Sequence, residues 1–139
     1  MNTWQLAEDF RTLIASFGVG GAWLHEQQAV EITRPSVTVS VSENPFSSDG
    51  KAGRFTLRIN VHSQAHDTPA VDHQGVVAAL RLRFFDPTEK VGTIAAMNAK
   101  GGGTRWALAG YSAGAEEPGE AGDAFTTVII VTGTIRQLF

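Results

Sequence analysis

Residues 54–85 constrain the architecture more than any other part of the chain, because they combine an alternating strand with the helix that follows it. Apolar and polar side chains alternate from Phe55 to His62, which is the two-residue period of a strand with one buried face. Residues 67–69 then give a helix start, with Thr68 as the N-cap and a proline at the first helical position. The segment therefore predicts a strand, a polar turn and a helix, but no reaction.

Similar signals predict the other elements. We expect helices over residues 3–17 and 69–85 and from the Asp86 cap to about Lys100, with strands over 36–42, 54–62, 106–111 and 125–135. The last strand is apolar on both faces and should be central. The predicted fold is one α+β domain over residues 1–139, in which helices pack on one face of a mainly antiparallel sheet of about four strands. We expect the buried face of the 69–85 helix to hold Val71, Val76, Ala79, Leu80 and Phe84.

Composition excludes some sites and limits others. The chain of 139 residues has no cysteine, so disulfides and thiolate metal sites are excluded. No apolar run approaches the ~20 residues of a membrane span, and residues 1–17 lack the layout of a signal peptide. We expect a soluble protein that needs no cofactor and binds no membrane.

Charge is concentrated in one of two polar connections. The first connection spans residues 43–53, and the second is an acidic arm over 113–124. The arm contains four of the 14 acidic residues, which leaves 10 against 11 Lys and Arg elsewhere. A neutral body with an acidic arm lacks the basic stripe of a nucleic-acid-binding protein. We expect no sequence-specific binding of nucleic acid.

Histidines crowd the strand-to-helix turn. His62, His66 and His73, with two aspartates nearby, would supply nitrogen and oxygen ligands to a metal. They are predicted to lie on a strand, in a turn and on a helix, so no helical pair spaced by four residues presents two imidazoles together. Surface or capping roles fit this spacing better than a metal site.

Two further motifs have the composition of catalytic or phosphate sites. Both glycine clusters follow helices, whereas a dinucleotide fingerprint requires a strand before the glycines and a helix after them. The segment 110–114 reads Gly-Tyr-Ser-Ala-Gly, the pattern of a nucleophile elbow around Ser112. That elbow needs a strand followed by a helix, and here another strand follows. No histidine comes after Ser112, so we expect no enzyme, with a serine hydrolase as the remaining catalytic alternative.

The order of elements resembles the tail-terminator and tail-completion proteins of long-tailed bacteriophages. The similar parts are the strand Arg54-Phe-Thr-Leu-Arg-Ile-Asn-Val-His62, the helix from Pro69 to Phe85 and the closing strand from Phe125 to Ile135. The resemblance is one of layout, and it carries no catalytic or ligand motif.

This resemblance implies a structural virion protein, assembled in the host cytoplasm. Such a protein forms a homo-oligomeric ring, in the family a hexamer, that caps or completes the tail tube and meets neck proteins. The two polar connections would then form subunit contacts, so the candidate interface residues are Asp49, Lys51, Glu116, Glu117, Glu120 and Asp123. A small non-enzymatic module that binds a ligand or another protein is the alternative.

Overall fold

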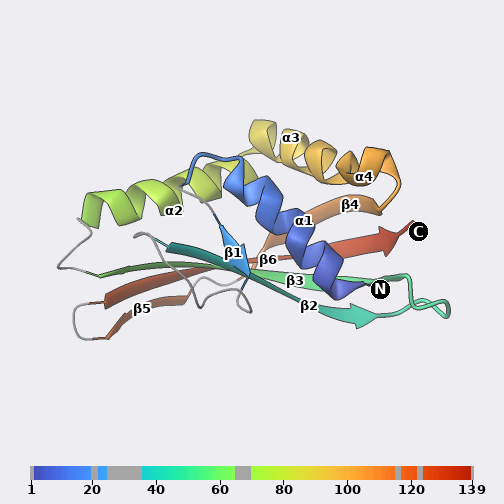
Figure 1. Cartoon of the computed structure of the whole chain (residues 1–139), viewed down its shortest axis with the longest axis horizontal. Coiled ribbons are helices and arrows are strands. Elements are labelled where there is room, and N and C mark those ends of the chain that lie inside the picture. Colours follow the sequence, from blue (N-terminus) through green and yellow to red (C-terminus); the bar gives the residue numbers. More distant parts are fainter. Residues whose placement is uncertain are drawn as a thin grey trace.

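Helices cover one face of a single sheet, and none of the described helices lies on the other face (Figure 1). The computed structural model describes residues 2–19, 22–24, 36–64, 70–114, 117–121 and 124–138. The helices are α1 (Thr3–Ala15), α2 (Ala70–Phe85), α3 (Pro87–Asn98) and the single turn α4 (Lys100–Gly103). The strands are β1 (Trp23–Leu24), β2 (Ser36–Pro45), β3 (Ala52–Gln64), β4 (Trp106–Ala113), β5 (Glu117–Ala121) and β6 (Ala124–Gln137).

The sheet is mainly antiparallel, as predicted. Its strand order is β1-β2-β3-β6-β4, and β5 pairs with β6 outside this order. Every pairing is antiparallel except that of β1 with β2. The predicted central position of the last strand is confirmed, because β6 lies between β3 and β4. The α+β class is confirmed, but the sheet has six strands in the described residues rather than about four.

Alternation along β3 decides which face is buried. Its apolar residues from Phe55 to Val61 are at most 1% exposed, whereas Arg54 and Arg58 are exposed. The helices supply the opposing layer, and the ring centroids of Phe10 on α1 and Phe55 lie 5.5 Å apart. Burying one such side chain contributes roughly 1.5–3 kcal/mol. The core therefore lies between the helices and one face of β2, β3 and β6.

Side-chain caps fix where α1 and α3 begin. The side chain of Asn2 accepts a hydrogen bond from the backbone N–H of Gln5 at the start of α1. Asp86 accepts from the N–H groups of Thr88 and Glu89 at the start of α3, with proline next to the cap. The predicted Asp86 cap is confirmed. The cap predicted at Thr68 lies outside the described residues.

The first polar connection is shorter than predicted. We expected a loop over residues 43–53, but β2 continues to Pro45 and β3 begins at Ala52, so that Pro45 pairs with Gly53. A Cβ atom at Gly53 would lie 2.8 Å from the Asn44 carbonyl oxygen. This glycine therefore serves close pairing of two strands, and only residues 46–51 form the turn.

The acidic arm is not wholly a loop. Residues 117–121 form β5, which pairs with residues 124–128 of β6 as a hairpin. Its Pro118 and Gly119 are turn formers in sequence. Proline is tolerated in an edge strand, where its missing donor faces away from the ladder. The composition of residues 117–121 therefore predicted a loop where the structure has a strand.

Candidate functional site

The face of the sheet opposite the helices is polar, and we call it the open face. On β3 it carries Arg54, Thr56, Arg58, Asn60 and His62, which alternate with the core residues. Pairing with β6 places threonines beside them, because Thr134 is opposite Arg54 and Thr132 is opposite Thr56. The register of the two strands thus brings cationic and hydroxyl side chains together.

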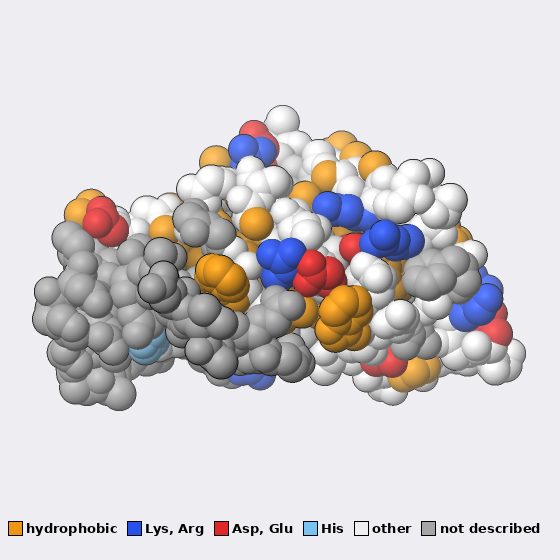
Figure 2. Space-filling model, viewed as in Figure 1, with side chains coloured by type: hydrophobic (Ala, Val, Ile, Leu, Met, Phe, Trp, Pro, Cys, Tyr) orange, Lys and Arg blue, Asp and Glu red, His pale blue; other side chains and the backbone are white. Residues whose placement is uncertain are grey.

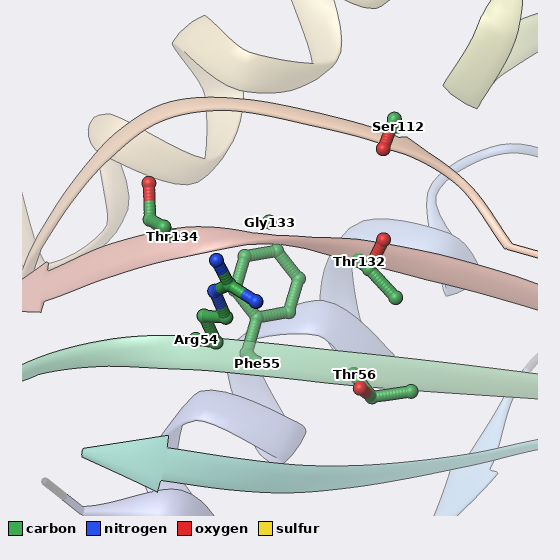
Figure 3. A pocket seen from close by; sticks show the side chains of 7 residues that line it. All are labelled: Arg54, Phe55, Thr56, Ser112, Thr132, Gly133 and Thr134. Atoms are coloured by element: carbon green, nitrogen blue, oxygen red, sulfur yellow. The ribbon is translucent and has the colours of Figure 1, made fainter. Parts of the chain in front are cut away.

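A hollow of about 420 Å³ lies on this face near the start of β3 and the end of β6, and we call it the Arg54 hollow. It crosses three strands, since β3, β6 and β4 all contribute to its lining. Figure 3 shows the guanidinium group of Arg54 extending toward β6 near Gly133, and the hydroxyl groups of Ser112 and Thr132 pointing toward one another. The lining residues are Arg54, Phe55, Thr56, Ser112, Thr132, Gly133 and Thr134.

The chemistry of the Arg54 hollow suits an anionic group. Within the part of the chain that the structure describes, Arg54 is exposed and makes no hydrogen bond or ion pair. A guanidinium group presents five N–H donors in a fork that matches a carboxylate or a phosphate, and each hydroxyl of the hollow adds one more donor. The hollow can therefore receive a carboxylate or phosphate oxygen supplied from outside the chain.

An apolar hollow of about 190 Å³ adjoins the Arg54 hollow, and Thr134 lines both. Its lining includes Phe46, which is 63% exposed, and Ala107 and Ala109 of β4. We call the two hollows together the open-face patch. Its named members are Phe46, Arg54, Thr56, Ala107, Ala109, Ser112, Thr132 and Thr134.

Two of the predicted interface residues lie in the turn between β2 and β3. The carboxylate of Asp49 accepts from Ser47 Oγ at 2.6 Å, from the Lys51 backbone N–H at 3.0 Å and from Arg136 at 2.8 Å. The bond from Ser47 has the largest effect, and together these bonds lower the pKa of Asp49 to about 2. The Asp49 carboxylate therefore shapes its own turn, whereas the Lys51 side chain is exposed.

The other predicted interface residues belong to the acidic segment. Glu117 and Glu120 are residues of β5, opposite Val128 and Phe125 of β6. Glu116 and Asp123 lie outside the described residues. The structure thus brings part of the segment onto the sheet, at the end of β6 opposite the Arg54 hollow.

The histidines do not form one cluster. His62 lies on the open face, where its Nδ1 contacts Thr126 Oγ1 at 3.0 Å. His73 is 3% exposed on the helix side, with Nδ1 2.7 Å from Ser63 Oγ and Nε2 3.0 Å from Thr127 Oγ1. Burial lowers the pKa of His73. His66 lies outside the described residues.

A metal shared by His62 and His73 is disfavoured because the sheet separates their imidazoles. Within the described ranges, no group of three or more His, Cys, Asp and Glu side chains has the arrangement to hold a metal ion. The pair of Ser63 and His73 has the hydrogen bond of a nucleophile and its base. Ser63 is 0% exposed, however, so this pair has the burial of a structural network.

Ser112 is not on a nucleophile elbow. It lies inside strand β4, opposite Thr132, and the irregularity of that strand falls earlier, between Leu108 and Gly110. On the open face the described histidine is His62, six residues along β3 from Thr56, or about 20 Å at ~3.4 Å per residue. Neither the strained turn nor an adjacent base accompanies Ser112 in the described structure.

Sequence inspection missed the open-face patch. The signal for Arg54 and Thr56 was present, since both fall on the polar side of an alternating strand. Their meeting with Ser112 and Thr132 depends on the strand order β3-β6-β4, which the sequence pattern does not determine. Phe46 lies within residues 43–53, which the sequence predicts as a polar connection, so the pattern gave no reason to expect an apolar contact there.

Comparison with known proteins adds no family. No family model matches the chain, and the search of curated proteins finds no match. Among the described helices, none is both long and apolar enough to cross a membrane. The functional argument therefore depends on the geometry of the chain itself.

Proposed function

We propose that the protein is a structural, non-enzymatic virion subunit that assembles as a homo-oligomeric ring, caps or completes a phage tail tube and joins it to the neck. The observation that carries this proposal is the open-face patch, on a sheet whose other face is covered by helices. The layout of elements, which resembles tail-terminator proteins, supplies the assembly class.

Two members of the open-face patch, Phe46 and Arg54, are of residue types that favour a protein interface. Aromatic residues and arginine are enriched at interface centres, and lysine and glutamate are depleted there. Phe46 and Arg54 supply the first two groups, and hydroxyl side chains surround Arg54. The side of the molecule in Figure 2 differs, because its hydrophobic side chains lie in small separate patches among charged ones.

The sheet edge at β4 favours contact through the face rather than by strand addition. β4 ends the strand order, so its outer edge is a potential template for another strand. The register shift between Leu108 and Gly110 interrupts that edge, and such bulges hinder edge pairing. We therefore place the subunit contact on the open face.

The proposal includes partners and place. The subunit meets further copies of itself, six in the ring that the resemblance implies, and then tail-tube and neck proteins. It acts in the virion after assembly in the host cytoplasm. No membrane or cofactor takes part in this function.

Size-exclusion chromatography with light scattering, followed by negative-stain electron microscopy, tests the ring. The purified chain should give closed rings at high concentration, or rings at the end of added tail tubes. A chain that stays monomeric at high concentration and does not bind tail tubes would contradict the proposal. The stoichiometry from light scattering gives the ring size.

A small binding module is the second candidate, favoured by the Arg54 hollow. A module of this kind would bind a small anion through Arg54 and its neighbouring hydroxyls. Inorganic phosphate, citrate and glutamate, each added in a melting experiment, should then raise the melting temperature, because a ligand that binds only the folded state stabilises it. Arg54→Gln is the matched control, and an equal shift in that variant would exclude the hollow.

A further inference from the structure

We infer that the outer edge of β2 pairs with the same edge of a second copy of this chain, so that two sheets join across a two-fold axis. This contact is additional to the ring contact on the open face and goes beyond the proposed function. It involves residues 40–45, the second half of β2, which we call the β2 edge. The occupant of the edge is an antiparallel strand of identical sequence.

The backbone of the β2 edge directs hydrogen-bonding groups away from the sheet. The Phe46 N–H donates to the Ala52 carbonyl at 3.0 Å, which makes the even-numbered residues of β2 the hydrogen-bonded partners of β3. The N–H and C=O groups of Val41 and Glu43 therefore point outward. β1 pairs with β2 only earlier in that strand, and among the described strands none pairs with the outer side of residues 40–45. Such a row of backbone groups is a template for another strand.

The opposite edge of the sheet, at β4, is occupied by side chains of α3. The amide group of Asn98 donates to the Leu108 carbonyl at 3.0 Å and accepts from the Leu108 N–H at 2.7 Å. Lys90 Nζ donates to the Tyr111 carbonyl. These bonds satisfy outward groups of β4 that an added strand would need. Pairing of β2 in one copy with β4 in the next is therefore disfavoured, which leaves the self-complementary pairing of β2 with β2.

An exposed tryptophan flanks the β2 edge on the helix side. Arg11 of α1 donates to the Ala22 carbonyl, just before β1. Trp4 precedes Arg11 by about two helical turns and so lies on the same side of α1. Figure 1 shows the start of α1 near the turn that joins β2 and β3, so α1 runs opposite to β2 and Trp4 lies beside the second half of that strand. Its side chain is 58% exposed, and tryptophan is a frequent anchor at protein interfaces.

The residues of the β2 edge select one register for this pairing. Pairing Glu43 with Glu43 would place two carboxylates opposite each other, and it would set Val41 opposite Pro45, which has no N–H to donate. Pairing Val41 with Val41 would bring Glu43 opposite Val39, whose outer side already pairs with β1. Centring the pair on Ser42 avoids both conflicts, because Val41 of each copy then exchanges two backbone hydrogen bonds with Glu43 of the other.

Disulfide trapping tests this register in the full chain. The chain has no cysteine, so a single introduced cysteine reports only its own contact. Ser42→Cys should form a disulfide-linked dimer on mild oxidation, because two residues opposite each other in a non-hydrogen-bonded pair have Cα atoms about 4.5 Å apart, within disulfide range. Asn44→Cys is the matched control, since Asn44 is exposed on the same face of the same strand. Its two copies would lie four residues apart along the paired strands, or about 14 Å at ~3.4 Å per residue.

We expect Ser42→Cys to cross-link at least about tenfold faster than Asn44→Cys. Adding Glu43→Pro to the Ser42→Cys chain should abolish this advantage, because proline removes an outward N–H that makes no bond in the described structure. Circular dichroism shows whether that double variant is folded. Trp4→Ser gives a second measurement that does not alter the strand, and it should also slow the cross-link, with Val91→Ser on α3 as its exposed apolar control.

Equal cross-linking rates at positions 42 and 44 would overturn the β2 contact. So would a cross-link at position 42 that is unchanged by Trp4→Ser and, in the folded double variant, by Glu43→Pro. Electron microscopy scores closed rings separately from the cross-link. Failure of the β2 contact therefore leaves the ring proposal standing, and a chain that cross-links at position 42 without forming rings supports the β2 contact alone.

Discussion

Trp106 Nε1 donates a hydrogen bond of 2.7 Å to Oδ2 of Asp9, although 97 positions separate the two residues. The other carboxylate oxygen, Oδ1, accepts from Arg105 at 2.7 Å and from Gln5 at 3.0 Å. Asp9 lies on α1 and Trp106 opens β4. One buried carboxylate therefore ties the first helix to the strand at the far edge of the sheet.

We expect Asp9→Ala to lower the free energy of unfolding by about 3 kcal/mol. The substitution leaves the buried indole N–H of Trp106 without its acceptor and removes the partner of Arg105. Urea unfolding followed by circular dichroism measures the effect. Glu8→Ala is the matched control, because the Glu8–Arg11 pair has side chains 23% and 24% exposed and should contribute less than ~1 kcal/mol. Equal losses in the two variants would contradict this role for Asp9.

Gly133 is required by the irregular pairing of β4 with β6. A Cβ atom at this position would lie 2.5 Å from the Gly110 carbonyl oxygen and 2.9 Å from Tyr111 Cβ. We expect Gly133→Ala to destabilise the fold by about 2 kcal/mol, since the backbone of β4 must move. Gly110→Ala has open space around its Cβ atom and should change stability by less than ~1 kcal/mol. Thermal melting of both variants measures the difference. A larger loss of stability in Gly110→Ala than in Gly133→Ala would contradict the prediction.

The sequence predicted the layout better than the side chains that meet. Strand period, caps and glycine ends specify local elements, so the α+β class and the central β6 were predictable. The buried stripe of α2 was predicted in part. Leu80 and Phe84 are 0% exposed as expected, but Val71 is 73% exposed and was wrongly placed in the core.

Val71 was wrongly placed in the core because the apolar pattern disregarded a buried polar residue on the same helix. The buried positions of α2 include His73, Val77, Leu80 and Phe84, which have helical spacings of four, three and four. His73 fits the stripe because Ser63 and Thr127 satisfy its ring nitrogens. A pattern of apolar residues alone passes over a histidine, and its two partners come from strands distant in sequence. The Arg54 hollow depends on strand order in the same way.

His73 should make stability depend on pH. Burial lowers its pKa in the folded state below the ordinary 6.5, so the unfolded chain binds a proton that the folded chain resists. Its stabilising contribution is therefore complete above pH 6.5 and is lost as pH falls through the folded-state pKa. Urea midpoints between pH 7.5 and 5 should show this decline. His73→Gln should flatten it, and an unchanged slope would assign the decline to other groups.

Tyr111 has a buried hydroxyl oxygen with no partner at hydrogen-bond geometry in the described structure, because the Thr93 hydroxyl near it donates to the Arg83 carbonyl instead. Burial raises its pKa to about 12, and because it is the one tyrosine of the chain, its absorbance reports that value directly. The folded state keeps the proton between pH 10 and 12 while the unfolded state loses it, so stability falls across this range.

We expect Tyr111→Phe to be neutral or to stabilise the fold by up to about 1 kcal/mol. It removes the unpartnered hydroxyl and keeps the ring, which lies 5.8 Å from Phe84 and 4.9 Å from Lys90 Nζ. The loss of stability above pH 10 should be smaller in this variant. A clearly destabilised Tyr111→Phe would show that the hydroxyl is hydrogen-bonded in solution.

Substitution of Phe46 tests whether the open-face patch serves assembly or folding. Its side chain is 63% exposed, so Phe46→Ser removes little buried area from the monomer and should shift the melting temperature only slightly. If Phe46 fills the apolar part of a subunit contact, the same substitution should weaken self-association about tenfold or more, as truncation of a central aromatic anchor does. Leu82→Ser is the control, because Leu82 is 51% exposed on α2 in the helix layer. Sedimentation velocity on both variants should show a dissociated Phe46→Ser and an unaffected Leu82→Ser. The opposite result would place the subunit contact on the helices.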